Sequence, residues 1–138
     1  MSEKLAPWAT LAARLTLATN LVYYGLRNTT GMFHGPGLKG FTQMLEGLGV
    51  AGAHLAGPVF AFGGMLGGIA LAVGFLFKTV CWSHIVVLGG AIWFVQRWSY
   101  GVHSQGCEYS IALIALSLLV IVHGPGPYAF RLEKQKQK

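Results

Sequence analysis

The sequence predicts an all-α membrane protein, a bundle of four transmembrane helices with a short interfacial amphipathic helix between the first and the second. Hydrophobic residues make up 54 % of the 138 residues and charged residues only 10 %, whereas a soluble domain carries about a quarter charged residues. Lys, Arg, Asp and Glu are also absent between Glu46 and Lys78, between Lys78 and Arg97, and between Glu108 and Arg131. This composition excludes an ordinary soluble enzyme, a disordered tail and a nucleic-acid-binding protein.

The first transmembrane helix is expected over about residues 7–27. Pro7 and Trp8 open it, and a leucine-rich run follows. Arg14 interrupts this run near one end, where we expect its guanidinium group to extend toward the lipid head groups. A cleaved signal peptide is the alternative interpretation, but Arg14 would break its apolar region and no Ala-x-Ala cleavage site follows.

The interfacial helix is expected over about residues 40–48. Phe41, Met44, Leu45 and Leu48 recur at i, i+3, i+4 and i+7 with polar residues between them. This spacing places the four apolar side chains on one face, as in a helix that lies in the plane of the membrane interface.

The other three transmembrane helices are expected over about residues 52–77, 79–97 and 108–123. A helix needs about 20 apolar residues to cross the hydrocarbon core of a bilayer, and each uncharged stretch holds one such crossing. A basic tail over residues 129–138 completes a single domain that spans residues 1–138.

Four crossings place both termini and the turn at Lys78 on the same side of the membrane. Most of the 10 Lys and Arg residues fall on that side, namely Lys4, Arg14, Lys78, Arg131, Lys134, Lys136 and Lys138. Because cytoplasmic segments carry the excess of Lys and Arg, we expect both termini in the cytoplasm and the protein in a bacterial or archaeal inner membrane. Cys81 and Cys107 then lie on opposite sides, too far apart for a disulfide, and Cys107 is expected as a free thiol outside.

Small residues recur four apart along the second transmembrane helix at Gly63, Gly64, Gly67 and Gly68. Faces of small residues let membrane helices approach closely. We expect these glycines to form a helix-packing face, more commonly used within a bundle than toward a partner chain.

Polar residues follow one face of the first helix at Thr16, Asn20, Tyr23 and Tyr24. Lipid cannot satisfy such groups, so this polar stripe must face protein or water. Hydrogen bonds that fix the register of the bundle are the first interpretation, and a cavity for a quinone head group or another substrate is the second.

Three charged residues, Arg27, Arg97 and Glu108, map to the outer ends of the first, third and fourth transmembrane helices. An arginine beside a carboxylate at that boundary would stabilise its charged form. We therefore expect Glu108 to form an ion pair with Arg27 or Arg97, with solvated helix ends as the alternative.

His84 and His123 fall on neighbouring helices, and they form the one histidine pair that invites a b-type haem. The Gly-Pro-Gly-Pro run directly after His123 places it near the interface, which argues against haem. No cluster has the ligand spacing of a zinc site, so no metal is expected. No catalytic residue is assigned, because the sequence has no CxxC, phosphate-binding loop or Ser-His-Asp motif.

The order of several short motifs resembles the DoxX family of small four-helix membrane proteins. The stretch Leu21-Val22-Tyr23-Tyr24-Gly25 is similar to the family's LYHG signature, and the ending Gly124-Pro125-Gly126-Pro127-Tyr128 is similar to its GPGxYS close. Further similarities are Gly40-Phe41 through Leu48-Gly49, Gly67-Gly68, Gly74-Phe75-Leu76 before Lys78, and Glu108 at the start of the last helix.

The resemblance implies a function in membrane redox chemistry, because the name-giving member is a subunit of a thiosulfate:quinone oxidoreductase. We therefore expect an accessory or structural subunit of a quinone-linked complex, with a quinone as the only cofactor in view. A carrier or channel for a small solute is the alternative, and a structural subunit that packs against pigment- or cofactor-bearing chains is another. The expected partners are the lipid bilayer and either other membrane subunits or further copies of the chain.

Overall fold

Helices are the only regular secondary structure in the described part of the chain. The computed structural model describes residues 2–97 and 106–129, with the side chains of residues 2 and 3 left aside, and none of these residues lies in a β-strand. Most of the expected basic tail, 129–138, therefore lies outside the described residues. The elements are α1 (Ser2–Thr30), the 3-10 turn η1 (Met32–His34), α2 (Gly37–Gly47), α3 (Ala53–Val73), α4 (Phe77–Ala91), the π-helical turn η2 (Ile92–Gln96) and α5 (Glu108–His123).

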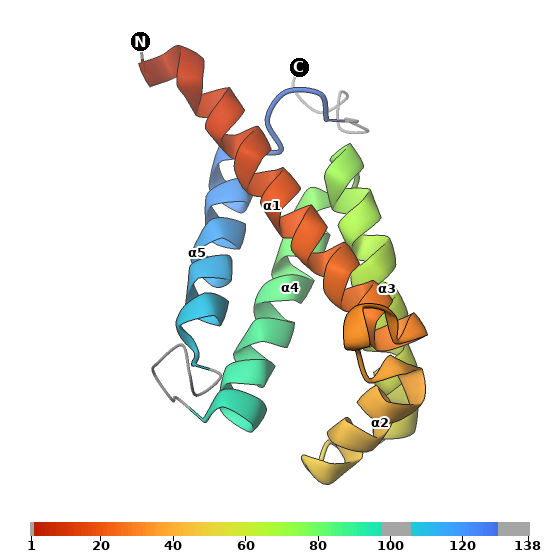
Figure 1. The fold of residues 1–138 in the computed structure, drawn as a ribbon. Helices are drawn as coiled ribbons and strands as arrows, with labels where there is room; N and C mark the ends of the chain where they lie inside the picture. Colours follow the sequence, from red (N-terminus) through yellow and green to blue (C-terminus); the bar gives the residue numbers. More distant parts are fainter. Residues whose placement is uncertain (1, 98–105, 130–138) are drawn as a thin grey trace.

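Helix α1 crosses the molecule diagonally and packs along both α3 and α5 (Figure 1). Helix α4 packs mainly against α5, and α2 packs beside the first half of α3 at the end of α1. Helix α1 begins and α5 ends at the same end of the molecule, while α2 lies at the other end (Figure 1). The helix order thus brings the two ends of the described chain together.

Two helices are long and apolar enough to cross a membrane, Ala53–Val73 and the continuous stretch Phe77–Gln96. Helix α5 is apolar but has 16 residues. Helix α1 has 29 residues, which is ample length at about 1.5 Å of rise per residue, but its charged and hydroxyl side chains make it less apolar. Two crossings therefore follow from length and composition, and crossings by α1 and α5 belong to the proposal below.

The burial pattern differs from that of a soluble protein in its many exposed large apolar side chains and its buried polar ones. Large apolar side chains are exposed along the helices, among them Leu55, Val59, Leu66, Val86, Trp93 and Val122. Several polar side chains are buried instead, namely Thr10, Arg14, His84, Ser110 and Ser117. Lipid favours apolar groups on the outside and leaves polar groups to find partners inside, so this pattern supports a membrane protein.

Several helix boundaries differ from those expected from the sequence. Helix α1 extends beyond 7–27 at both ends, and Pro7 lies inside it in the second turn rather than at its start. Helix α2 begins at Gly37, directly after Pro36, rather than at residue 40. Helix α3 ends at Val73 because Gly74 takes the left-handed conformation, with φ 82°.

Helices α1 and α3 approach closely at Gly25 and Gly68. A Cβ atom at Gly68 would lie 2.7 Å from Cγ2 of Val22 and 2.9 Å from the carbonyl oxygen of Ala18. A Cβ atom at Gly25 would lie 2.6 Å from the Cα atom of Met65. Both positions require glycine because the opposite backbone is already in contact.

The four glycines expected to pack helices fulfil different roles. Gly64 is on the same side of α3 as Gly68, and a Cβ atom there would be 3.8 Å from the carbonyl oxygen of Leu21. Gly67 faces Val80 of α4, whereas Gly63 has open space around it. The close helix contact therefore involves Gly68 and, with less crowding, Gly64.

Candidate functional site

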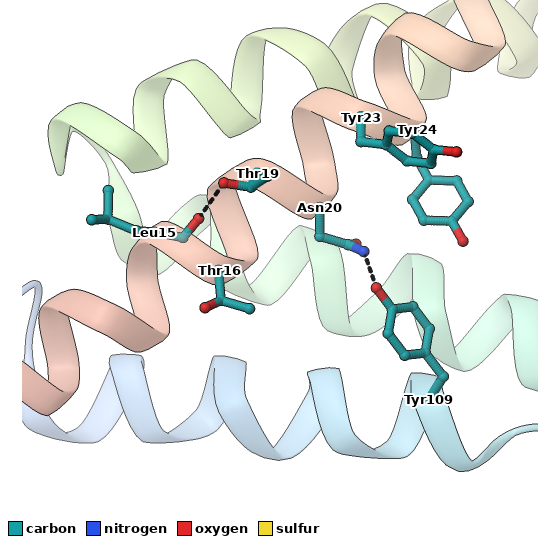
Figure 2. Close-up of a pocket in the computed structure, with 7 residues that line it drawn as sticks. All are labelled: Leu15, Thr16, Thr19, Asn20, Tyr23, Tyr24 and Tyr109. Carbon is teal, nitrogen blue, oxygen red and sulfur yellow. Dashed lines mark hydrogen bonds between the residues drawn. The ribbon is translucent and has the colours of Figure 1, made fainter. Parts of the chain in front are cut away.

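An open groove runs along α1 on the side that faces α5. It has a volume of about 540 Å³. Its seven lining residues are Leu15, Thr16, Thr19, Asn20, Tyr23 and Tyr24 of α1 and Tyr109 of α5 (Figure 2). The structure thus places all four residues of the polar stripe, Thr16, Asn20, Tyr23 and Tyr24, in one groove.

The periodicity of α1 explains why these residues share a face. Positions 16, 20, 23 and 24 are separated by about one and two helical turns, so their side chains project to the same side. Thr16 and Thr19 donate their hydroxyl hydrogens to the carbonyl oxygens of Ala12 and Leu15, each at 2.9 Å. Their hydroxyl protons are therefore used within the helix, and Asn20 is left to reach across to another helix.

Asn20 makes that connection to α5. Its Nδ2 donates a hydrogen bond to the phenol oxygen of Tyr109 (Figure 2). Because the Tyr109 oxygen accepts here, its own hydrogen remains available to a ligand in the groove. Tyr109 was not among the predicted site residues, since the sequence does not show which residue of α5 faces Asn20.

Tyr23 and Tyr24 close the same end of the groove. Their rings are perpendicular, with centroids 5.3 Å apart. The Tyr23 ring also packs against the ring of Phe33, with a distance of 5.0 Å between the two centroids. Tyr23 is 39 % exposed and Tyr24 is 40 % exposed, so a ligand in the groove can reach both side chains. None of the seven lining residues is charged or strongly nucleophilic, and the groove is therefore suited to binding and orienting a molecule through hydrogen bonds.

A family model described as DoxX matches residues 9–97. The chain belongs to the DoxX family. The matched range runs from the second turn of α1 to the residue after η2 and includes every groove residue except Tyr109. No curated protein and no solved structure matches this chain.

The guanidinium group of Arg14 was expected to extend toward the lipid head groups, but in this DoxX protein it is buried instead. The Arg14 side chain is 1 % exposed, and Nη1 donates a hydrogen bond to the carbonyl oxygen of Pro125. Its Nε is buried without a hydrogen-bond partner. The diagonal course of α1 places position 14 beneath the loop that follows α5, so the guanidinium group is enclosed by protein.

That loop packs closely on α1. A Cβ atom at Gly126 would lie 3.0 Å from the carbonyl oxygen of Pro7, and the rings of Trp8 and Tyr128 are 6.2 Å apart. Gly126 has φ 73°, which favours glycine. The Gly-Pro-Gly-Pro run placed His123 near the interface in the sequence-based prediction, but it did not indicate Arg14 as its contact.

The expected outer cluster of Arg27, Arg97 and Glu108 does not form. Arg27 packs against the backbone of Gly35, and its Nε is buried without a hydrogen-bond partner. Arg97 lies beside the end of α2, while Glu108 is exposed at the start of α5. Within the described part of the DoxX chain no ion pair joins these three residues, because the diagonal α1 carries Arg27 away from α5.

The two histidines considered as haem ligands make separate contacts. His84 is buried between α4 and α5, with Nδ1 3.3 Å from Oγ of Ser117. His123 is exposed, and its Nδ1 is 3.1 Å from the carbonyl oxygen of Leu119 in its own helix. The geometry therefore gives no support to a haem held between these residues.

Both cysteines of the DoxX protein are free, but neither is an accessible thiol. Cys81 and Cys107 have fully buried side chains. Cys107 is free, as expected, but its side chain is buried at the start of α5 rather than accessible. Among the described residues no group of three or more His, Cys, Asp or Glu could hold a metal ion.

Proposed function

We propose that this DoxX protein is an accessory subunit of a quinone-linked redox complex, and that the groove between α1 and α5 holds the quinone head group. In this proposal all four long helices cross a bacterial or archaeal cytoplasmic membrane, and both termini are cytoplasmic. The observation that carries the proposal is the Asn20–Tyr109 pair, which presents a free phenolic hydrogen to the groove. A quinone carbonyl oxygen is an acceptor for such a hydrogen.

The form of the groove supports a ligand that enters from the lipid. It is open on the side of the bundle, while the centre of the bundle is filled by Leu17, Leu71 and Val120, all fully buried. A lipid-soluble molecule can reach a lateral groove without crossing this core. A solute channel needs a path along the helix axes, so the packing favours the quinone over the small-solute alternative.

The types of side chain that line the groove support an accessory role. The lining side chains are apolar, hydroxyl-bearing or amide groups, and none of them is a Cys, His, Asp, Glu or Lys that could act as a nucleophile or a general base near neutral pH. The protein would therefore bind and orient the quinone, and a partner chain would supply the electrons. The exposed apolar side chains of α3, α4 and α5 offer surface both for lipid and for such a partner.

Quinone binding can be measured on the whole chain in nanodiscs with a short-chain quinone as the probe. Tyr109→Phe removes the phenolic hydrogen, and Asn20→Leu removes the donor that orients it. We expect each variant to bind at least tenfold more weakly. Ser83→Ala is the matched control, because the exposed Ser83 hydroxyl bonds to Thr79 within α4, away from the groove. Unchanged affinity in both groove variants would exclude this site.

Purification in mild detergent separates the proposed function from its alternatives. An accessory subunit is expected to be recovered with companion chains that contain a redox cofactor. Recovery with pigment-bearing chains would support the purely structural role. A stable assembly of this chain alone, together with uptake of a solute by proteoliposomes, would support the carrier.

A further inference from the structure

A second groove lies at the opposite end of the molecule from the N-terminus of α1. It has a volume of about 400 Å³ and is lined by Gly47 and Leu48 at the end of α2, by Trp93 and Phe94 of η2, and by Arg97, which follows η2. None of these residues lines the groove between α1 and α5. Trp93 is 67 % exposed and Phe94 46 %, so the groove has an open apolar rim beside one cation.

The end of α4 is built so that Arg97 faces this groove. The turn η2 is π-helical, a geometry that is frequent at functional sites. Gln96 is directed toward α5, where its Nε2 donates to Oγ of Ser110 at 2.9 Å. Arg97 follows in the left-handed conformation, with φ 44° and ψ 40°, which is uncommon for a residue other than glycine. The Gln96–Ser110 bond thus holds the turn that places Arg97 beside α2.

The charge of Arg97 is not neutralised within the described residues. Its side chain is exposed, and no carboxylate among the lining residues pairs with it. Glu46 precedes Gly47 in α2 but does not line the groove. A guanidinium group binds phosphate through two parallel hydrogen bonds, so Arg97 makes this groove suited to a ligand that carries a phosphate.

We propose that this second groove binds the head group of an anionic phospholipid, with Arg97 on the phosphate. Trp side chains are enriched at the level of the head groups, and Trp93 lies in the last turn of the candidate membrane span Phe77–Gln96. Phe94 and Leu48 provide apolar surface for the first part of an acyl chain. An anionic lipid is favoured over a zwitterionic one, because the ammonium group of the latter competes with Arg97 for the phosphate.

The binding test measures thermal unfolding of the full chain in detergent with added phosphatidylglycerol, phosphatidylcholine or inorganic phosphate. We expect phosphatidylglycerol to raise the Tm of the wild type by several degrees and phosphatidylcholine to raise it far less. Arg97→Gln should lose most of this shift. Lys39→Gln is the matched control, because Lys39 is an exposed cation of α2 outside the groove, and it should retain the shift.

Two results of this experiment would overturn the proposal. A full shift in Arg97→Gln would show that the lipid acts elsewhere, and an equal shift with inorganic phosphate would show that the groove binds a free anion instead of a lipid.

A second measurement does not depend on the folding of Arg97→Gln. Phosphatidylglycerol with brominated acyl chains should quench the fluorescence of the wild type more than brominated phosphatidylcholine. This excess should disappear in Trp93→Phe if the lipid occupies the groove. Equal quenching by the two lipids in the wild type would contradict the proposal, and neither result bears on quinone binding between α1 and α5.

Discussion

The guanidinium group of Arg14 donates a hydrogen bond to the carbonyl oxygen of Pro125, which joins the first helix to the loop after the last one. Both residues are buried. Burial of a guanidinium group costs free energy unless protein groups replace its hydrogen bonds to water. Here the carbonyl oxygen of Pro125 replaces one of those hydrogen bonds. The contact therefore links the folding of the C-terminal loop to the position of α1.

Replacement of Arg14 is expected to release the loop that follows α5. Arg14→Met removes every side-chain donor and leaves the buried Pro125 carbonyl without its partner, which costs about 1–3 kcal/mol. Limited proteolysis in detergent should then cleave after residue 123 faster than in the wild type. Lys4→Gln, a change of an exposed cation in the same helix, should leave the cleavage rate unchanged. Equal rates in all three proteins would mean that the loop is held by other contacts.

Enlargement of Gly68 is expected to separate α1 from α3. The side chain of Gly68→Leu would overlap Val22 and the backbone at Ala18, and overpacking of this kind costs about 1–3 kcal/mol. A lower Tm in detergent is the expected result. Gly63→Leu places the same side chain in open space on the same helix and should keep the wild-type Tm. A comparable loss in both variants would point to the helix backbone rather than to the contact.

The orientation in the membrane can be tested with two exposed lysines. Lys39 in α2 and Lys78 in α4 lie on opposite sides in the proposed topology and are both exposed. In a variant without its native cysteines, Lys39→Cys should react with a membrane-impermeant thiol reagent added to intact cells, and Lys78→Cys should react only after lysis. The reverse pattern would invert the topology. The native Cys81 and Cys107 are unsuited to this test because both are buried.

His84 and Ser117 should be energetically coupled. Ser117 donates its hydroxyl hydrogen to the carbonyl oxygen of Leu113 at 2.9 Å, so its oxygen is left to accept from Nδ1 of His84. A double-mutant cycle with His84→Ala and Ser117→Ala should give an interaction energy of at least about 0.5 kcal/mol in unfolding experiments. Additive effects of the two changes would show that the 3.3 Å contact contributes nothing to stability.

The sequence predicted the all-helical fold and the family because both depend on local composition and on the order of short motifs. The helix ends were less accurate because capping depends on single residues such as Gly74, whose left-handed conformation ends α3 early. The crossing of α1 over α3 was predicted only in part. Gly68 was identified from its spacing, but its counterpart Gly25 could not be, since only the packed structure shows which residue meets Met65.

The groove residues of α1 were predictable because a polar stripe in an apolar helix is visible in its spacing. Tyr109 was not, since its pairing with Asn20 depends on how far α5 is shifted along α1. The same limitation explains the error at the outer end, where Arg27, Arg97 and Glu108 were expected at one depth. Residues at the same depth in the membrane are neighbours only if their helices are adjacent there. Because α1 crosses the bundle diagonally, its end at Arg27 lies away from α5.

The Arg14–Pro125 contact also bears on the order of events during synthesis. The two residues are separated by 111 positions, so α1 leaves the ribosome long before the loop exists. In the proposed topology the guanidinium group stays hydrated until the loop is made, so the first part of α1 is expected to remain near the membrane surface. The helices can therefore enclose Arg14 only when the chain is almost complete. Truncation before Pro125 should leave the guanidinium group of Arg14 in contact with water.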